Sequence, residues 1–251
     1  MCKKLGKEIA MAQLTSKQNS LHLPDSGSPL KARTFVLSCT MKTQNSTVSN
    51  SSKGAATRDA IVAAALKLAE TGGLEGLSIG NVAERVGMSK SGVFAHFGSR
   101  EDLQLAVLKA ATENFSEAVF YPAIKLKRGL PRLRAVLENM IEFYQGLANG
   151  CVILSASHEF DDQPGPVRDA VLAYLRQLRS ELVRAAHYAV EAGELDPQLD
   201  AEQLGFECFG IFLAVHHGLR ALRDPDSAAR GHSAFTRLLQ RCSPILTNQN
   251  I

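Results

Sequence analysis

A group of short polar side chains around residue 90 is the part of the sequence best suited to contact another molecule. Ser89, Lys90 and Ser91 follow one another at the start of a predicted short helix. Small polar or basic side chains in the N-terminal half of a helix can reach base edges in the DNA major groove. The chemistry that these residues could perform is therefore recognition of nucleic-acid bases.

The following residues of this predicted helix fall into two groups, those that could contact DNA and those that pack in the protein core. Phe94 can pack on a thymine methyl group or a sugar, and His96 can donate a ring N–H to a phosphate. Gly92 either lets the backbone approach DNA or leaves room between two packed helices, and both interpretations stay open. Val93 and Phe97 have the spacing of core positions.

Three further residues could bind backbone phosphates. Ser78 and Asn81 lie at the start of another predicted helix, where the positive end of the helix dipole favours anions. Arg100 lies at the start of the next long helix. For each residue the alternative is a structural one, namely a helix cap or a solvated charge.

The sequence contains no motif that predicts catalysis or a metal site. His158 begins an HExxH-like segment, but the position of the second histidine is Asp162. His216 and His217 are adjacent, and neighbouring helical positions point about 100° apart, which is unfavourable for binding one metal ion. The five cysteines are scattered and form no CxxC pair: Cys2, Cys39, Cys151, Cys208 and Cys242. We expect a protein that is not an enzyme, with no catalytic residues, no metal and no cofactor.

A helix-turn-helix is the arrangement that would position these side chains. Ser78 is a good N-cap for one short helix, and Ser89 for the next. Gly87 permits the tight turn between them, and Ser99 begins a capping box. The predicted helices are 58–71, 79–86, 90–97 and 100–120, with Gly72-Gly73 ending the first and Pro122 helping to stop the last.

The rest of the chain has helical periodicity. Further helices are predicted at about 130–148, 150–160, 166–193, 200–223 and 228–242. Neither a run of alternating strands nor an internal repeat is present. The fold class is all-α, with a three-helix helix-turn-helix domain followed by a helical bundle.

The motif residues resemble the TetR family of transcriptional regulators. The matching positions are Leu77-Ser78-Ile79, Val82-Ala83, Val86-Gly87-Met88-Ser89-Lys90 and Val93-Phe94, followed by Phe97, Ser99, Glu101 and Leu103. The resemblance covers about 57–105. The segment from Gly150 to Arg168 is similar to one C-terminal subgroup of these regulators.

The resemblance implies a homodimer that binds double-stranded operator DNA. It implies a DNA-binding domain at 57–105 and an effector-binding and dimerisation domain at 106–251. Phe94 replaces the family's usual tyrosine, Ala95 stands where histidine is common, and His96 occupies the usual phosphate-contacting aromatic position. The predicted DNA-binding residues are Ser78, Asn81, Ser89, Lys90, Ser91, Gly92, Phe94, Ala95, His96 and Arg100.

Residues 1–56 are predicted to be a flexible basic tail. They carry eight Lys or Arg residues against two acidic residues, which leaves 57–251 mildly acidic within a chain of net charge +3. Their polar composition cannot bury enough apolar surface to offset the entropy of ordering. A basic arm that follows DNA phosphates is the alternative. Met41 offers a second translation start, from which residues 1–40 would be missing.

Aromatic side chains in the C-terminal half could line a pocket for a partly apolar small-molecule effector. The predicted effector-binding residues are Phe115, Phe143, Tyr144, Cys151, His158, Tyr174, His187, Phe206 and Phe209, with Phe160, Phe212 and Glu207 as further candidates. His158, His187 and Glu207 would be the polar anchors if they point inward. Plain core packing is the alternative for each aromatic residue.

The helix predicted at 200–223 is more apolar than one buried stripe requires. With the helix at 228–242 it would, by analogy with the family, form a four-helix dimer interface. A ligand that favours a conformer with misspaced recognition helices would release the DNA. The expected function is a repressor released from a palindromic operator.

Composition excludes other classes of protein. The 251 residues are 45% hydrophobic and 21% charged, and no apolar stretch is long enough for a membrane span. We expect a cytoplasmic protein that does not contact a membrane. One alternative is a thiol-responsive regulator that uses Cys151 and Cys208 with the same DNA-binding domain, and another is a ligand-binding or enzymatic protein with an incidental helix-turn-helix.

Overall fold

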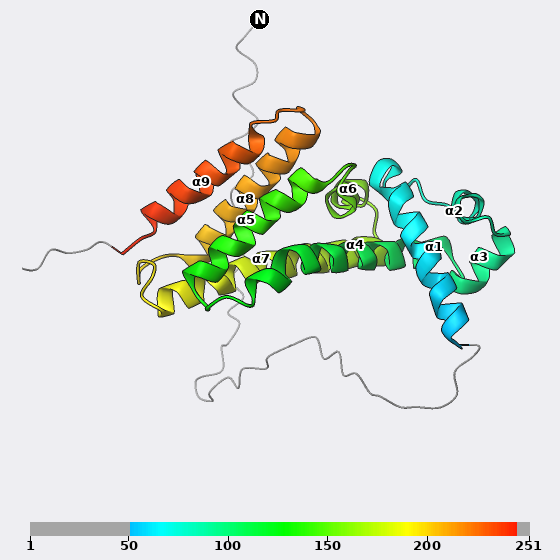
Figure 1. Ribbon diagram of the computed structural model, residues 1–251, viewed down its shortest axis with the longest axis horizontal. Helices are drawn as coiled ribbons and strands as arrows, with labels where there is room; N and C mark the ends of the chain where they lie inside the picture. The colour runs from blue at the N-terminus through cyan, green and yellow to red at the C-terminus, as the bar shows by residue number, and fades with distance from the viewer. Residues whose placement is uncertain (1–50, 245–251) are drawn as a thin grey trace, which may run out of the picture. The chain divides into compact units, whose positions relative to one another are not determined.

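The computed structural model describes residues 51–244 of the chain, and this part folds into nine α-helices without a strand (Figure 1). Most of the predicted tail, with Cys2 and Cys39, lies outside the described residues. The helices are α1 (Ser51–Gly72), α2 (Ile79–Val86), α3 (Lys90–Phe97), α4 (Arg100–Ala123), α5 (Leu130–Gly146), α6 (Val152–Glu159), α7 (Pro166–Glu191), α8 (Ala201–Arg220) and α9 (Ser227–Arg241). The prediction of an all-α protein is confirmed.

The first helix begins earlier than its sequence pattern predicts. It starts at Ser51, whereas the amphipathic pattern begins near Thr57. The Thr57 hydroxyl donates a hydrogen bond to the carbonyl of Lys53, one turn back (2.8 Å). Extending an established helix by a turn adds one backbone bond for each residue fixed, so weak helix formers can join its end.

The predicted caps of the short helices are present. Ser78 and Asn81 form a reciprocal capping box at the start of α2. Gly87 ends α2 with φ of 67°, a left-handed conformation that favours glycine. The hydroxyls of Ser89 and Ser99 accept hydrogen bonds from the third backbone amide of α3 and α4, respectively. Local hydrogen bonding thus fixes the turn between α2 and α3.

Helix α4 continues three residues beyond its predicted end. Pro122 lies inside its last turn, and the helix ends where the Ile124 amide donates to the carbonyl of Phe120 (2.9 Å). Ala123 is completely buried, so tertiary packing holds this turn although proline lacks an amide donor.

Two packed groups of helices share α4. Helices α1, α2 and α3 pack around Ile61, Val82, Val93 and Phe97, and α1 and α3 also contact α4. Helix α4 then packs against α5 and α7, while α8 packs between α7 and α9 (Figure 1). Helix α6 contacts α1, α4 and α7, so it touches both groups.

Among the helices of residues 51–244, none combines the length and apolar character that crossing a membrane requires.

Candidate functional site

Helix α3 presents one face outward and buries the other. The side chains of Lys90, Ser91, Phe94 and Ala95 are exposed, whereas those of Val93 and Phe97 are buried. The hydroxyl of Ser89 lies 3.1 Å from that of Ser91. The predicted polar positions therefore lie at the exposed start of a short helix, and the predicted core positions anchor it.

Gly92 serves packing within the turn. A Cβ at this position would lie 3.2 Å from Ser89 Oγ and 3.3 Å from Met88 Cε. The missing side chain leaves room for the cap and for the half-buried Met88. These contacts give Gly92 a packing role, and its close approach to DNA stays a prediction.

A hollow of about 400 Å³ lies between the start of α2 and the outward face of α3. It is lined by Ile79, Lys90, Ser91, Phe94 and Ala95. The Lys90 chain runs over Gly80, since a Cβ built there would lie 3.2 Å from Lys90 Cε. An apolar surface and an ammonium group thus adjoin on the face that is predicted to read DNA.

Ser78 and Asn81 are engaged in the cap of α2. The side-chain oxygen of Asn81 accepts from the Ser78 amide (2.9 Å), and its Nδ2 donates to the Gly76 carbonyl (2.9 Å). The Ser78 hydroxyl accepts from the Asn81 amide (3.1 Å). Both side chains are exposed, but their first role is to position the start of α2.

Arg100 is exposed, and its guanidinium also donates to the backbone of the loop before α2. Its Nε donates to the Leu77 carbonyl (2.6 Å), and its Nη2 donates to the Glu75 carbonyl. Both carbonyls belong to the loop before α2, so neither accepts a backbone hydrogen bond of a helix. The Arg100 guanidinium therefore holds this loop against the start of α4, which is the structural role that the sequence left open, and its contact with a phosphate stays a prediction.

The loop between α1 and α2 is also tied to α6. The Glu159 carboxylate accepts from the Glu75 amide (2.9 Å) and lies against Gly73, where a Cβ would overlap it. Gln104 of α4 is buried and donates to the Leu74 carbonyl (2.7 Å). Sequence reasoning missed Glu159 and Gln104 because their partners are more than 25 residues away.

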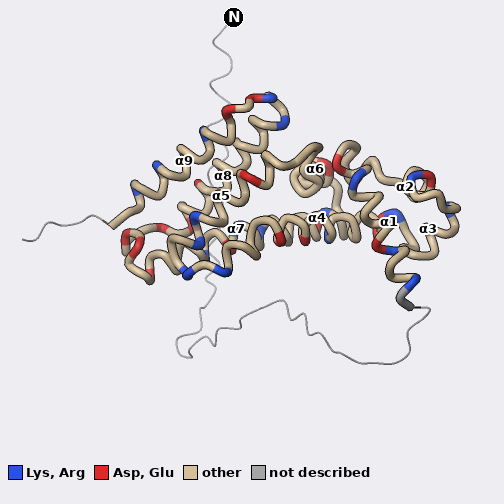
Figure 2. The backbone as a smooth tube through the Cα atoms, viewed as in Figure 1, with Lys and Arg blue, Asp and Glu red and all other residues tan. Residues whose placement is uncertain are grey.

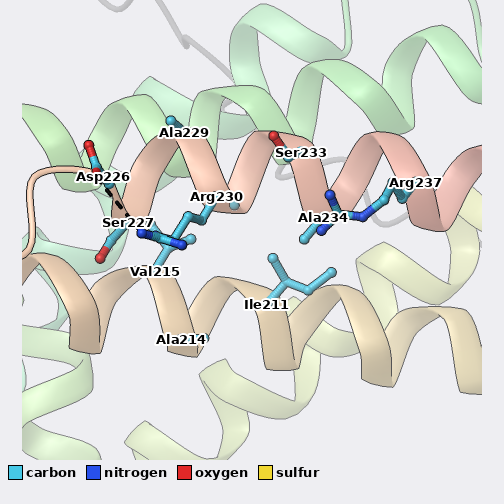
Figure 3. Close-up of a pocket in the computed structure, with 11 residues that line it drawn as sticks. Ile211, Ala214, Val215, Asp226, Ser227, Ala229, Arg230, Ser233, Ala234 and Arg237 are labelled. Atoms are coloured by element: carbon cyan, nitrogen blue, oxygen red, sulfur yellow. Dashed lines mark ion pairs between the residues drawn. The ribbon is translucent and has the colours of Figure 1, made fainter.

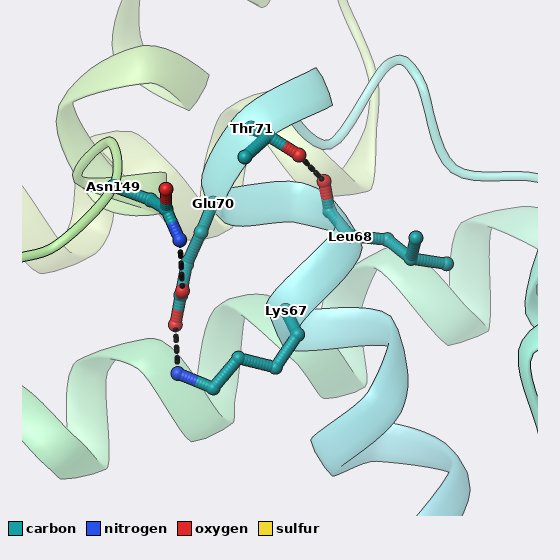
Figure 4. A network of polar contacts seen from close by, with 5 residues as sticks. All are labelled: Lys67, Leu68, Glu70, Thr71 and Asn149. Atoms are coloured by element: carbon teal, nitrogen blue, oxygen red, sulfur yellow. Dashed lines mark hydrogen bonds and ion pairs between the residues drawn. The ribbon is translucent and has the colours of Figure 1, made fainter.

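A second set of contacts joins the end of α1 to the loop before α6 (Figure 4). Glu70 accepts from Lys67 (2.8 Å) and from Asn149 Nδ2 (3.3 Å). The Gly150 amide donates to the Glu70 carbonyl (2.7 Å). Helix α6 is therefore attached at both ends to the segment that precedes the helix-turn-helix.

Several predicted effector residues meet in an aromatic cluster between α4, α5, α7 and α8. Phe115 is at its centre, with ring centroids 5.1 Å from Phe143, 6.2 Å from Tyr174 and 6.4 Å from Phe212. Tyr144 packs on Phe212 at 4.7 Å, and Phe209 lies on the other side of Phe212. The structure brings these distant segments together, and their role in effector binding stays a prediction.

Two polar atoms in this cluster are buried and make no hydrogen bond of good geometry among residues 51–244, namely Tyr174 Oη, which lies near the Ser116 side chain, and His216 Nε2. Burial, followed by the nearby Arg220, His217 and His158, lowers the pKa of His216 to about 4, so the ring is neutral at pH 7. Burial also raises the pKa of Tyr174. His216 was not predicted as a site residue, although its spacing of i+4 from Phe212 places it on the same helical face.

Other predicted effector residues lie outside the cluster. The side chains of His158 and His187 are exposed, so they are not the inward-facing anchors that were predicted. Phe206 is 63% exposed on α8 and faces the groove toward α9. Glu207 accepts a hydrogen bond from Gln203 of the same helix (2.9 Å). Each of these residues lies on the outer side of its helix, and amino-acid composition alone does not show whether a residue points outward or inward.

The two candidate redox cysteines are buried. Cys151 is the N-cap residue of α6 and faces the Tyr144 hydroxyl, and burial raises the pKa of its thiol. Burial, followed by the nearby Cys242 and Glu207, raises the pKa of Cys208 to about 12. Thiolates are the reactive form of cysteine, so these surroundings give the thiol-responsive alternative no support.

Helices α8 and α9 together form a grooved face (Figure 3). One hollow of about 710 Å³ is lined by small or apolar residues of both helices, with Arg230 and Arg237 beside them. A second hollow of about 400 Å³ continues past Phe206 and Gly210. Arg230, Arg237 and Arg241 recur along α9 (Figure 2), and Arg230 forms ion pairs with Asp224 and Asp226.

Comparisons with known proteins agree with this arrangement. Residues 61–107 match the family model "Bacterial regulatory proteins, tetR family", and residues 129–235 match "Tetracyclin repressor-like, C-terminal domain". A search of curated proteins found no match.

Three solved structures share the fold. A TetR transcriptional regulator from Chloroflexus aurantiacus is 26% identical, with TM-score 0.64, and the match covers 75% of this chain and 95% of that one. AibR, solved with isovaleryl coenzyme A and operator DNA, is 23% identical, with TM-score 0.57 and coverage of 72% and 95%. FadR from Bacillus subtilis, solved with stearoyl-CoA, is 17% identical, with TM-score 0.60 and coverage of 71% and 96%. From the two matched domains and the shared fold, the chain belongs to the TetR family of transcriptional regulators, which are DNA-binding proteins and not enzymes.

Proposed function

We propose that this regulator is a homodimeric repressor that a small molecule releases from a palindromic operator. The observation that carries the proposal is the outward face of α3, where Lys90, Ser91, Phe94 and Ala95 are exposed while the opposite face is anchored. A short helix exposed in this way can enter the major groove. The proposed DNA-binding domain is 57–105, and the effector-binding and dimerisation domain is 106–251.

The grooved face of α8 and α9 is the proposed dimer interface. Phe206 and Leu213 are exposed on α8, and the small residues Gly210 and Ala214 near them leave the α8 backbone open to a partner helix. A two-fold interface uses the same patch on both copies, so one patch is sufficient. Dimerisation supplies the second recognition helix that a palindromic operator requires.

The aromatic cluster is the proposed effector site. Buried polar atoms are normally hydrogen-bonded, so Tyr174 Oη and His216 Nε2 are positioned to contact a ligand. The surroundings favour a partly apolar ligand with a polar group that these two atoms can bind. The acyl-CoA ligands of AibR and FadR are suitable first compounds to test.

Release would pass through α6. The Tyr144 hydroxyl faces Cys151 at the start of α6, and Glu159 at its end holds the Glu75 amide. A ligand that displaces Tyr144 would therefore move the loop that precedes the helix-turn-helix. Successive major grooves are about 34 Å apart, so a small displacement is sufficient to prevent both recognition helices from docking together.

A reporter assay tests the regulatory role. A duplex selected by the protein from a random pool is placed upstream of a reporter gene, with and without the regulator. A repressor lowers reporter expression, and higher expression in its presence would contradict that role. Isovaleryl-CoA and stearoyl-CoA are then tested for release of the duplex by wild type and Tyr174→Phe.

A further inference from the structure

The exposed phenyl ring of Phe94 has no role in the folding of α3. Its side chain is 53% exposed, whereas Val93 and Phe97 of the same helix supply the buried contacts. The ring borders the 400 Å³ hollow that Ile79 and Ala95 also line. Exposed aromatic groups beside an apolar hollow are typical of a binding surface.

The chemistry of this hollow matches one feature of the major groove. Thymine alone among the four DNA bases presents a methyl group there, and apolar side chains recognise it by contact. Ile79, Phe94 and Ala95 provide such contacts, and phenylalanine has no hydroxyl with which to bind a phosphate. The ammonium of Lys90, beside the same hollow, can donate to the N7 and O6 acceptors of guanine.

We propose that the hollow between α2 and α3 binds the 5-methyl group of one thymine in each operator half-site, with Phe94 as the specificity-determining residue. Lys90 then contacts a guanine next to that thymine. The inference rests on the proposed operator binding and specifies which base the exposed face reads. Continuity of the hollow with the outward face of α3 favours a base edge as its occupant.

Uracil substitution tests the proposal directly, because it removes only the methyl group and keeps every hydrogen bond of thymine. The full-length protein first selects its duplex from a random pool, and each thymine is then replaced singly by uracil. One thymine in each half-site should show about fourfold weaker binding, and about fifteenfold when both half-sites are changed. No uracil effect at any thymine would overturn the proposal.

A thermodynamic cycle assigns the effect to Phe94. In Phe94→Ala the preference for thymine over uracil at that position should fall well below that of the wild type, because only Ile79 and Ala95 still contact the methyl group, and in Phe94→Leu, which keeps a larger apolar side chain, it should fall less. Tyr121→Ala, which removes a ring that is 47% exposed on α4, should retain the full preference. An equal uracil effect in wild type and Phe94→Ala would overturn the assignment.

Failure of operator binding is distinguishable from failure of this inference. If selection enriches no sequence, the proposed function fails. If a sequence is enriched and bound but uracil has no effect at any thymine, only the thymine-methyl site is overturned. Circular dichroism of each variant shows whether the helices are intact.

Discussion

At the scale of single residues, side chains near α3 divide into those that build the reading face and those that remain free to contact DNA. Asn81 and Arg100 direct their polar groups to backbone atoms of the chain. Lys90 and Ser91 have exposed side chains on the outward face. Polarity and position in the motif do not separate these two groups, because the partners of Arg100 lie more than 20 residues earlier.

Replacing Arg100 should therefore affect stability more than phosphate binding. Arg100→Ala should lower the free energy of unfolding by about 1–3 kcal/mol, the usual cost of losing hydrogen bonds from a charged group. Urea denaturation measures this loss, and Lys109→Ala, which removes only an exposed ion pair, should cost less than about 1 kcal/mol. The salt dependence of DNA binding should keep its slope, whereas a slope reduced by about 0.9 would identify a phosphate contact.

His216 should make stability sensitive to mild acid. The unfolded chain has the ordinary histidine pKa of about 6.5, whereas burial lowers the pKa of folded His216 to about 4. Between these two pKa values, the unfolded chain binds a proton at His216 that the folded chain does not bind. The free energy of unfolding therefore keeps its full value above pH 6.5 and falls as the pH decreases toward 4.

Urea denaturation at pH 7 and pH 5 tests this effect. The loss of stability over this interval should be smaller in His216→Phe than in the wild type. His187→Phe, at an exposed position of α7, should behave as the wild type does. Equal losses in the wild type and His216→Phe would contradict a buried neutral histidine.

At the scale of elements, the sequence predicted features that depend on neighbouring residues, and it did not predict contacts between distant residues. The serine caps of α2, α3 and α4 and the left-handed Gly87 depend on residues within one turn, and each was predicted correctly. The attachment of α6 to the loop before α2 depends on Glu159 and Glu75, which are 84 residues apart. The same limit explains why Phe206 was assigned to the interior, since helical spacing does not identify which apolar face is covered.

The attachment of α6 predicts a local change in hydrogen exchange. Glu159→Ala removes the acceptor of the Glu75 amide, and exchange at residues 73–78 should become about tenfold faster. Glu159→Gln keeps an acceptor oxygen and should show a smaller change. Glu142→Ala, at an exposed position of α5, should leave this segment unchanged, and unchanged exchange in Glu159→Ala would rule out the attachment.

At the scale of the whole molecule, the account requires two copies of the chain. The α8–α9 face combines the exposed Phe206 with hollows of about 710 and 400 Å³. A single short recognition helix makes few base contacts, each worth about 1–3 kcal/mol of discrimination. Specific binding to an operator therefore depends on a partner that presents the same helix again.

Breaking the proposed interface should separate the copies and weaken operator binding. Ala214→Arg places a further guanidinium beside Arg230 and Arg237 on the grooved face, and sedimentation should then give the mass of one chain. Operator affinity should fall at least about tenfold, because one half-site is lost. Leu126→Arg, a matched change at an exposed residue after α4, should remain dimeric. A dimeric Ala214→Arg protein would refute the assigned face.

Selection of duplexes from a random pool by the full-length protein, followed by footprinting in a salt series, tests the central claim most directly. We predict an inverted repeat whose half-sites are centred about 34–36 Å or a multiple of that distance apart. Log affinity should fall linearly with log salt concentration, as phosphate contacts require. Enrichment of no sequence, or protection of one unrepeated half-site, would contradict the claim that two copies of α3 read the operator.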